Sequence, residues 1–516
     1  MMILVLLITL PIILIYLIQK QRKNTVTKQG RGAQLVPPGP PGLPFIGNLH
    51  QFGAASNPHV YLWKLSKKYG DLLHLKLGPA SAIVISSARL AKQVLKTQDL
   101  SFCKYTLTCS RPNSLGQQKL SYNCVDIVFS PYGEYWRDLR KITATHLLSI
   151  KKTQSFRPLR EDEIARVVSR ISDHGDGKVV NLSEITMALG SNLICRIAFG
   201  KRYDESGSEM RRFKGLLHEA QALMATFFVS DFYPSFGWID KITGLSSRLE
   251  TTFEKLDLFY QELIDDHLDP ARAKKTGDDD EDDDDILDVL IKLKQEKSCS
   301  IDLNWDHIKA LLMNIFIAAT DTSAASTVWT MTALMKAPRV MEKVQAEIRN
   351  SIAKKGKVDE NDLPKLPYLK AVISETLRLY PPAPLLVPRQ TIEKCTLEGY
   401  VIEPRTLVYV NAWAIARDPD YWENPDEFLP ERFLNSNIDI KGQDYGVIPF
   451  GSGRRICPGM YMGLANVELT VANLLYSFNW ELPPGIQAKD IDTDVMPGLT
   501  MHKKNALLLA PKKYVA

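Results

Sequence analysis

The segment Phe450-Gly451-Ser452-Gly453-Arg454-Arg455-Ile456-Cys457-Pro458-Gly459 directly precedes a long stretch of helical periodicity that runs from residue 460 to residue 478. Cys457 therefore lies at a helix N-terminus, where the helix dipole and nearby N–H groups favour the thiolate, the form of cysteine that binds metal. Three glycines allow close backbone approach. A lone cysteine is usually an inert buried residue. This constrained spacing instead predicts a loop that clasps an iron-bound sulfur.

The composition of the whole chain is that of a large folded protein. Of its 516 residues, 45% are hydrophobic and 24% charged, with a net charge of +5. No basic run outside the N-terminal region is long enough to favour nucleic-acid binding. The seven cysteines are odd in number and scattered, without C-x-x-C, which argues against a disulfide framework, a zinc ribbon or covalently attached haem.

The N-terminus predicts a retained membrane anchor over residues 1–19. Residues 2–18 are almost entirely apolar and reach the minimum length for a membrane-spanning helix. A cleaved signal peptide is the alternative, but no basic region precedes the run and no small-residue cleavage site follows it. Basic residues from Lys20 to Arg31 follow at once, and the positive-inside rule then places the remainder in the cytosol.

A basic, proline-rich hinge is expected over residues 20–48, before a folded body at 49–516. Pro37–Pro44 reads as a stiff spacer, with an SH3-type ligand as the alternative. In the body, residues 72–86 predict two strands around a turn, residues 399–413 predict a hairpin, and the dominant period elsewhere is helical. Residues 278–285 are all acidic, which predicts a solvated surface loop rather than a domain linker.

The cysteine segment resembles the signature of the cytochrome P450 family at Phe450, Gly453, Arg455, Cys457 and Gly459. The resemblance extends along nearly all of the chain after the anchor, and it is closest to the plant microsomal A-type group. It implies a cytochrome P450 fold, mainly α with small antiparallel β-sheets, behind a single transmembrane helix. It also implies haem b, with Cys457 as the axial iron ligand, which favours O–O cleavage, and Arg455 at a haem propionate.

Further residues match the family's haem-binding positions. Trp136 and Arg140 stand at i and i+4 on one helical face and resemble its propionate-binding pair; an exposed charge beside a packed tryptophan is the less favoured alternative. Arg389 is a weaker propionate candidate. Glu375 and Arg378, with Arg432, resemble the family's Glu-Arg-Arg network. That resemblance implies a structural ion cluster rather than a catalytic one.

Residues 318–323 resemble the oxygen-activating stretch of the family's long central helix. By that resemblance Thr322 hydrogen-bonds the oxygen being activated, and Asp321 relays protons. A carboxylate inside an otherwise apolar helix is costly without a task, and a mid-helix threonine can bond the i−4 carbonyl. A solvated pair on the outer face is the alternative. Ala319 departs from the glycine that the family usually has there.

The resemblance also implies a set of mostly apolar residues around the substrate, which suggests a lipophilic ligand. These are Ala318, Ala319, Leu385, Leu386, Met496 and Leu499, with Phe227 and Phe228 from the roof. The stretch from Cys103 to Cys109 is longer than usual for the family, which affects the first substrate-facing loop.

The chain has no nucleotide-binding fingerprint of its own. The resemblance implies a cytosol-facing, endoplasmic-reticulum monooxygenase that uses O2 and electrons from an NADPH-dependent flavoprotein reductase. Arg137, Lys141, Lys151 and Lys152 are candidates for the docking surface. The expected substrate is a plant specialised metabolite: an aldoxime, terpenoid, phenylpropanoid or alkaloid. Two alternatives are an isomerase or dehydratase that needs no reductase, and a non-catalytic membrane haem-binding protein.

Overall fold

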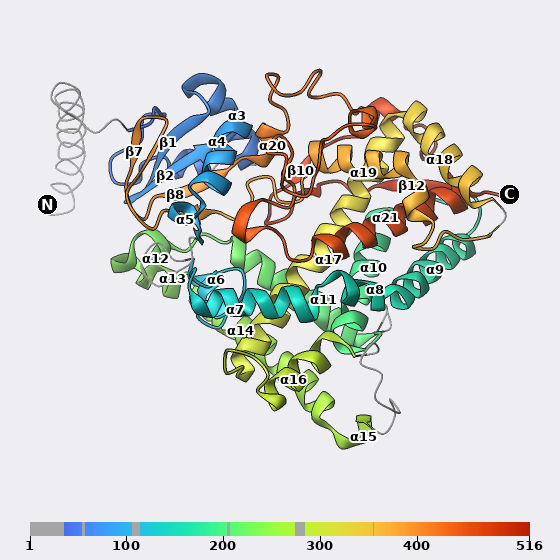
Figure 1. Ribbon diagram of the computed structural model, residues 1–516, viewed down its shortest axis with the longest axis horizontal. Helices are drawn as coiled ribbons and strands as arrows, with labels where there is room; N and C mark the ends of the chain where they lie inside the picture. The colour runs from blue at the N-terminus through green and yellow to red at the C-terminus, as the bar shows by residue number, and fades with distance from the viewer. Residues whose placement is uncertain are drawn as a thin grey trace, which may run out of the picture.

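The computed structural model describes residues 36–53, 57–105, 114–203, 207–273, 284–353 and 355–515. The expected membrane anchor, most of the expected hinge and most of the long loop after Cys103 lie outside these ranges. The described part is mainly helical, with its main sheet on one side of the molecule and smaller sheets among the helices (Figure 1). The predicted fold class is confirmed for this part of the chain.

The α-helices are α2 (Leu49–Gly53), α3 (Pro58–Tyr69), α4 (Ala88–Lys92), α5 (Asp99–Phe102), α6 (Leu115–Leu120), α7 (Glu134–Ile142), α8 (Ile150–Ser155), α9 (Arg157–His174), α10 (Leu182–Phe199), α11 (Ser208–Ala225), α12 (Val229–Phe232), α13 (Trp238–Ile242), α14 (Leu245–Leu268), α15 (Pro270–Ala273), α16 (Ile286–Glu296), α17 (Trp305–Lys336), α18 (Pro338–Ile352), α19 (Pro367–Leu379), α20 (Ala412–Ile415) and α21 (Met460–Ser477). The strands are β1 (Leu72–Leu77), β2 (Ala80–Ile85), β3 (Lys104–Tyr105), β4 (Val180–Asn181), β5 (Arg389–Gln390), β6 (Cys395–Leu397), β7 (Tyr400–Ile402), β8 (Leu407–Val410), β9 (Phe478–Glu481), β10 (Val495–Met496), β11 (His502–Lys503) and β12 (Leu508–Lys513).

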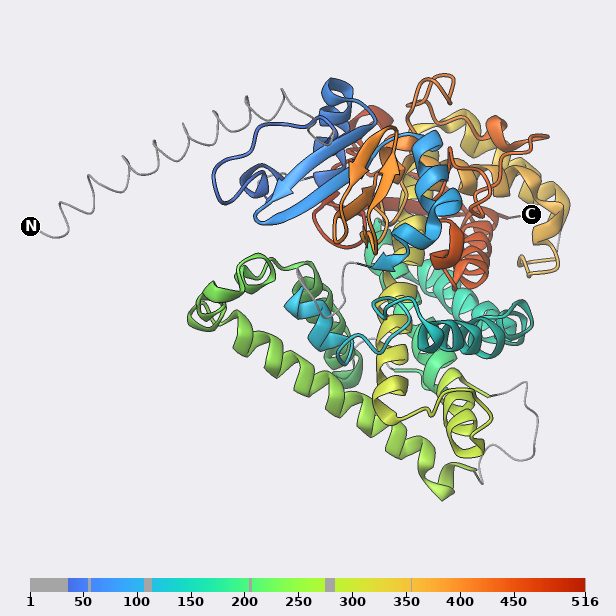
Figure 2. The ribbon, with the colours of Figure 1, turned by 60° about the vertical axis from the view of Figure 1, so that its left-hand side comes forward.

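Helix α17 runs through the middle of the molecule (yellow in Figure 2). Asn304 caps it, because its side chain accepts the backbone N–H of His307 at 2.9 Å. Among the described helices, α17 is the one that is long and apolar enough to cross a bilayer. Most of that stretch is buried inside the protein, so α17 is packed as a core helix.

Helix α10 packs tightly along α17 because Gly190 has no side chain. A Cβ at this position would lie 2.8 Å from the carbonyl oxygen of Thr320. The two backbones therefore approach closely just before the Asp321-Thr322 pair, which fixes the position of this part of α17.

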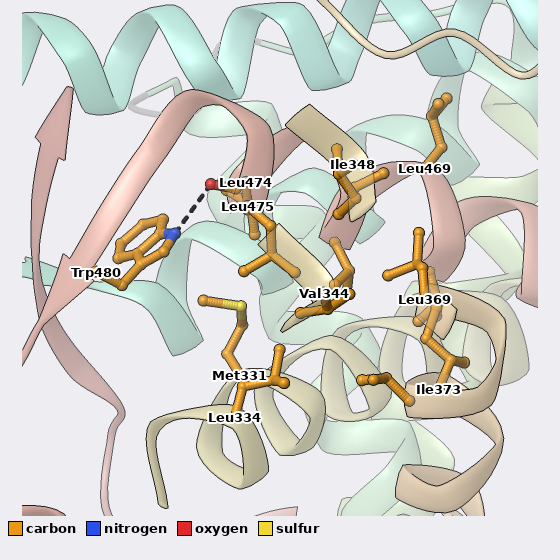
Figure 3. Close-up of a cluster of buried hydrophobic side chains, with 14 of the residues drawn as sticks. Met331, Leu334, Val344, Ile348, Leu369, Ile373, Leu469, Leu474, Leu475 and Trp480 are labelled. Carbon is orange, nitrogen blue, oxygen red and sulfur yellow. Dashed lines mark hydrogen bonds between the residues drawn. The ribbon is translucent and has the colours of Figure 1, made fainter. Parts of the chain in front are cut away.

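The largest apolar cluster joins α17 to α18, α19, α21 and strand β9 (Figure 3). Met331 and Leu334 of α17 meet Val344 of α18 and Leu475 of α21 in it. Trp480 packs there too, and its indole N–H donates to the carbonyl of Leu474 at 2.9 Å. Each such buried side chain contributes roughly 1.5–3 kcal/mol relative to exposure. The cluster anchors α21, the helix that follows Cys457.

The main sheet has the strand order β1-β2-β8-β5-β3. Strands β1 and β2 form the antiparallel pair predicted for residues 72–86. The hairpin predicted for residues 399–413 is wrong, because β7 pairs with β6 in a separate sheet. Strand β8 lies between β2, to which it is parallel, and β5. Both of its edges are thus taken by strands distant in sequence, and none remains for β7.

The described part of the expected hinge lies against the sheet. The carbonyl of Pro38 accepts the backbone N–H of His74 at 2.8 Å. Gly39 allows this contact, because a Cβ there would lie 1.9 Å from the carbonyl oxygen of His74. From Pro38 onward, the proline-rich segment is therefore part of the packed body rather than a free spacer.

The last two residues of the acidic run, which the structure describes, are not freely solvated. Asp285 is buried and caps α16, accepting the N–H of Asp288 at 2.9 Å. The imidazole Nε2 of His267, at the end of α14, lies 3.0 Å from Asp285 Oδ2. Asp284 pairs with Lys292 at 2.6 Å. Helix capping overrides charge repulsion here, and residues 278–283 lie outside the described ranges.

Candidate active site

A backbone hydrogen bond closes the loop around Cys457, and α21 begins just after it. The backbone N–H of Cys457 donates to the carbonyl of Phe450 at 2.9 Å. Gly453 has φ +74°, and a Cβ there would lie 2.1 Å from the carbonyl oxygen of Leu95. Only glycine satisfies both the left-handed conformation and this close approach. The loop is thereby wedged against the segment that precedes α5.

Asp99, at the start of α5, ties the loop to the rest of the protein. It accepts Arg389 Nη1 at 3.0 Å and lies 3.2 Å from Nε of Arg454. The second terminal nitrogen of Arg389 donates to the carbonyl of Ser452 at 3.1 Å. Sequence reasoning missed Asp99, because it belongs to no motif and its partners follow it by about three hundred positions.

A cavity of about 270 Å³ collects most of the residues expected at the haem. Its lining includes Cys457, Arg455, Phe450, Trp136, Arg140, Arg389, Ala318, Thr322 and Leu386, here called the Cys457 cavity. Gly453 and Gly459 shape the loop but do not line the cavity. Leu386 has φ +52°, an uncommon conformation for a non-glycine residue. The segment after α19 is thus held in a strained turn at the cavity wall.

Three arginines reach this cavity from different segments. Arg140 donates to the carbonyl of Ile456 at 2.6 Å, next to the cysteine. Arg455 donates to the carbonyl of Ser130 at 2.7 Å, and its guanidinium carbon lies 4.1 Å from the centre of the Trp136 ring. The Trp136 N–H itself donates to the carbonyl of Ile127 at 3.0 Å. Trp136 therefore serves as a stacking surface for Arg455 rather than as a free donor.

Burial raises the pKa of the Cys457 thiol, while the backbone N–H of Gly459 and the charge of Arg140 act in the opposite direction. The Gly459 N–H at the helix N-terminus thus acts in the predicted direction, against the larger opposing effect of burial. A coordinated metal deprotonates a thiol outright. An iron bound to this sulfur would therefore favour its anionic form against the effect of burial.

The lining fits haem. A mostly apolar wall suits the macrocycle, a cysteine sulfur suits the iron, and three guanidinium groups suit two carboxylates. Gly451 also lines this space, and a Cβ built there meets nothing within 4 Å. Because Gly451 has no side chain, this part of the wall leaves room for a flat ring beside the sulfur.

A buried carboxyl lies behind this wall. Asp126 is fully buried and accepts the Asn314 side-chain N–H and the backbone N–H of Phe129, both at 2.7 Å. Burial raises its pKa to about 7, against the lowering effects of these hydrogen bonds and of Arg455. Sequence reasoning also missed the Asp126–Asn314 pair. The one sequence feature that could have indicated it is a carboxylate inside the apolar stretch 124–129.

Asp321 and Thr322 point to different spaces. Thr322 lines the Cys457 cavity, and its hydroxyl donates to the carbonyl of Ala318 at 2.7 Å, as expected for a mid-helix threonine. Helix α17 stays continuous through this point. Asp321 is buried and lines a second cavity of about 440 Å³. The expected relay pair is thus divided between two cavities.

Of the expected substrate-lining residues, Ala318 and Leu386 line the Cys457 cavity and the others do not. Met496 and Leu499 line the second cavity. Ala319 packs into the helical core, because it lies on another face of α17 from Ala318, and Leu385 packs against the sheet. Phe228 is fully buried in the core, and half-exposed Phe227 stacks on Phe232. Successive residues on a helix point in directions about 100° apart, so neighbours in a short motif can face different spaces.

The Glu-Arg-Arg residues do meet. Arg378 contacts both carboxylate oxygens of Glu375, at 2.7 and 2.8 Å, and both side chains are fully buried. Arg432 reaches the same carboxylate at 3.4 Å. Arg378 also donates to the carbonyls of Ala416 and Pro425. These bonds join α19 to the irregular segment that leads to the Cys457 loop.

Comparison with known proteins gives one consistent family. The family model described as "Cytochrome P450" matches residues 37–510. The chain is 49% identical over 518 residues to "6,7,8-trihydroxycoumarin synthase" of Pastinaca sativa, covering 99% of this chain and 98% of that protein. It is 50% identical over 487 residues to "5-OH-xanthotoxin synthase" of Ammi majus, covering 93% of each.

A solved structure has the same fold. The structure titled "Zebra fish cytochrome P450 another structure with Abiraterone" aligns with a TM-score of 0.72 at 24% identity. The alignment covers 90% of this chain and all of that one.

Proposed function

The chain belongs to the cytochrome P450 family as a plant A-type member, and from this premise we propose that it hydroxylates a flat, oxygenated aromatic compound of the coumarin class. The family membership makes it a haem b monooxygenase of plant specialised metabolism. Coumarins are one class of the phenylpropanoid substrates expected from the sequence. The proposal rests on the near full-length similarity to two enzymes named for coumarin products.

The residues of the Cys457 cavity have separable tasks in this proposal. Cys457 would bind the haem iron, and Arg140, Arg389 and Arg455 would hold the haem carboxylates. Bound haem supplies the activation of O2 and the insertion of one oxygen atom into substrate. Ala318, Leu386 and Val387 present apolar surface to a lipophilic molecule.

Thr322 and Asp321 serve proton delivery. The Thr322 hydroxyl donates a hydrogen bond to the Ala318 carbonyl, so its oxygen keeps lone pairs that can accept a hydrogen bond from a donor in the cavity. Asp321 is the adjacent acid, and α17 has no other ionisable residue between Lys309 and Lys336. These two residues are therefore the candidates for moving protons at this point of the helix.

The proposed electron donor is an NADPH-dependent flavoprotein reductase. Arg137 and Lys141 are exposed on α7, the helix that carries Trp136 and Arg140 to the cavity. A basic surface this close to the haem residues would attract an acidic partner. Lys151 is exposed as well, whereas Lys152 is partly engaged with the carbonyl of Asp284 at 2.7 Å.

The proposed location is the endoplasmic-reticulum membrane, with a single span at residues 1–19 and the body in the cytosol. Large apolar side chains gather where the described chain begins and are exposed there, including Phe45, Phe236 and Trp238. The two segments are joined, since the Tyr233 hydroxyl donates to the carbonyl of Phe45 at 2.9 Å. An exposed apolar surface at the start of the described chain fits contact with lipid.

Reconstitution of the full chain with a plant reductase, NADPH and 18O2 tests the proposal. With 6,7-dihydroxycoumarin and xanthotoxin as probes, we expect a product carrying one labelled oxygen atom. Turnover of aldoximes, terpenoids or alkaloids alone would refute the coumarin class. Turnover without NADPH would instead establish an isomerase or dehydratase.

The sulfur ligand has a test of its own. In Cys457→Ser, the carbon monoxide difference spectrum of the reduced protein should lose its thiolate form. An unchanged spectrum would remove Cys457 from the proposed role.

A further inference from the structure

The second cavity lies along a different face of α17 from the Cys457 cavity. Thr322 and Ser326 line the first, whereas Asp321, Ala325 and Val328 line the second. At about 100° per residue, the two sets of α17 residues are centred roughly 130° apart around the helix. Water that enters the second cavity would therefore reach Asp321 on a face of α17 that does not line the Cys457 cavity.

Two side chains hold the Asp321 carboxylate at the wall of the second cavity. Gln221 of α11 donates its amide N–H to Asp321 Oδ2 at 2.6 Å. His502 of β11 brings Nε2 to 3.2 Å from the same oxygen. The partners come from two elements that are far apart in sequence, and the His502 side chain is partly exposed. Such donors offset the cost of burying the carboxylate and fix where it points.

The other ionisable groups of this cavity have different roles. Lys503 is tied to Asp492 at 2.7 Å and to the carbonyl of Asn505 at 3.0 Å. His218, one turn before Gln221 on α11, also lines the cavity. From α10, Ser183 and Thr186 add hydroxyl groups. Of these, Gln221 and His502 are the ones with a direct bond to Asp321 among the described residues.

We propose that Gln221 and His502 are positioning residues that keep Asp321 at the second cavity, so that protons for the reaction enter from there rather than through the Cys457 cavity. This inference rests on the proposed monooxygenase function. In each transfer, the Asp321 carboxylate accepts one proton from cavity water and releases it beside Thr322, returning to the anion. O2 and the electrons are those of the proposed function, so the step adds no further reactant.

The first test measures coupling, as product formed per NADPH consumed, with whichever probe coumarin is turned over. In His502→Ala and Gln221→Ala, we expect it to fall roughly tenfold, with more H2O2 and an unchanged KM. His502→Gln keeps an N–H donor and should restore most of the coupling. His218→Ala is the matched control, in the same cavity and without a described bond to Asp321, and it should behave as wild type. Unchanged coupling in His502→Ala would overturn the proposal.

The second test needs no turnover and therefore stands even if the proposed substrate is wrong. Asp321→Cys and Thr322→Cys holoproteins are labelled with 2-sulfonatoethyl methanethiosulfonate, with and without 4-phenylimidazole as a ligand that fills the Cys457 cavity. Peptide mass spectrometry separates these sites from the native cysteines. We expect 4-phenylimidazole to protect position 322 and leave the labelling rate at position 321 unchanged. Equal protection at both positions, or no labelling at 321, would refute entry through the second cavity.

Discussion

Asp99 and Arg389 are 290 positions apart in sequence, yet their side chains form a buried ion pair of 3.0 Å directly behind the Cys457 loop. Arg389 also donates a hydrogen bond to the carbonyl of Ser452, which lies in the cysteine segment. The loop that carries the candidate iron ligand is therefore braced from outside its own motif.

Replacing Asp99 should loosen this loop. Asp99→Asn leaves the buried Arg389 without its counter-charge, and breaking a buried pair typically costs about 3–5 kcal/mol. We expect a lower melting temperature and less haem bound per protein, measured by thermal unfolding and by absorbance. Glu481→Gln breaks an exposed pair with Lys512 and should change stability by only about 0–1 kcal/mol. Equal effects of the two variants would argue against the bracing role.

Gly453→Ala should disrupt the cysteine loop, because the new Cβ would meet the Leu95 carbonyl at 2.1 Å. The expected result is little or no thiolate-type carbon monoxide spectrum at normal expression. Gly485→Ala is the control, since Gly485 also has a positive φ but a Cβ there meets nothing within 4 Å. If both variants keep the spectrum, the close contact with Leu95 does not decide the loop's shape.

Glu375→Gln should destabilise the protein strongly, since it leaves Arg378 buried without its carboxylate. A loss of about 3–5 kcal/mol is expected in chemical unfolding. Haem loss should accompany it, because the segment joined by Arg378 leads to Cys457. Glu403→Gln, which removes an exposed partner of Lys394, should have little effect. A mild Glu375→Gln phenotype would contradict the role assigned to this cluster.

Asp126 predicts a pH-dependent term in stability. Its pKa is raised from 3.8 to about 7 in the folded protein, mainly by burial. The folded state thus keeps a proton that the unfolded state loses, so this group's stabilisation is present below about pH 4 and is lost as the pH rises to about 7. Asp126→Asn removes the titrating carboxyl group and, with it, this pH dependence of stability. Its melting temperature relative to wild type should rise between about pH 4 and pH 7 and then level off, and a constant difference would contradict this assignment.

Thr322→Ala should raise H2O2 release relative to product while leaving the carbon monoxide spectrum intact. The reason is that the variant loses the hydroxyl that lines the Cys457 cavity. Thr322→Ser keeps a hydroxyl and should retain most of the coupling. Equal coupling in wild type and Thr322→Ala would count against a role in proton delivery.

Much of the site could be read from the sequence because its parts are local. The cysteine segment, the Trp136-Arg140 pair and the Ala318-Thr322 turn each depend on spacing within one element, and all three contribute to one cavity. The same holds for Glu375 and Arg378, one helical turn apart. Local steric and helical rules fix such relations before the chain folds.

Other relations could not be read in this way. The sequence does not show that β8 pairs with β2 rather than β7, or that Pro38 packs on β1. It also places Asp321 and Thr322 side by side without showing that they face two cavities.

By itself, the sequence determined the family, the candidate iron-ligating cysteine and the mainly helical body, because these follow from contiguous residues and short periodicities. Only the tertiary structure decided which distant groups brace the Cys457 loop and which hold Asp321. Those partners lie between 100 and 355 positions away along the chain. They meet only when packing of the core has fixed the helices, so no local pattern records them.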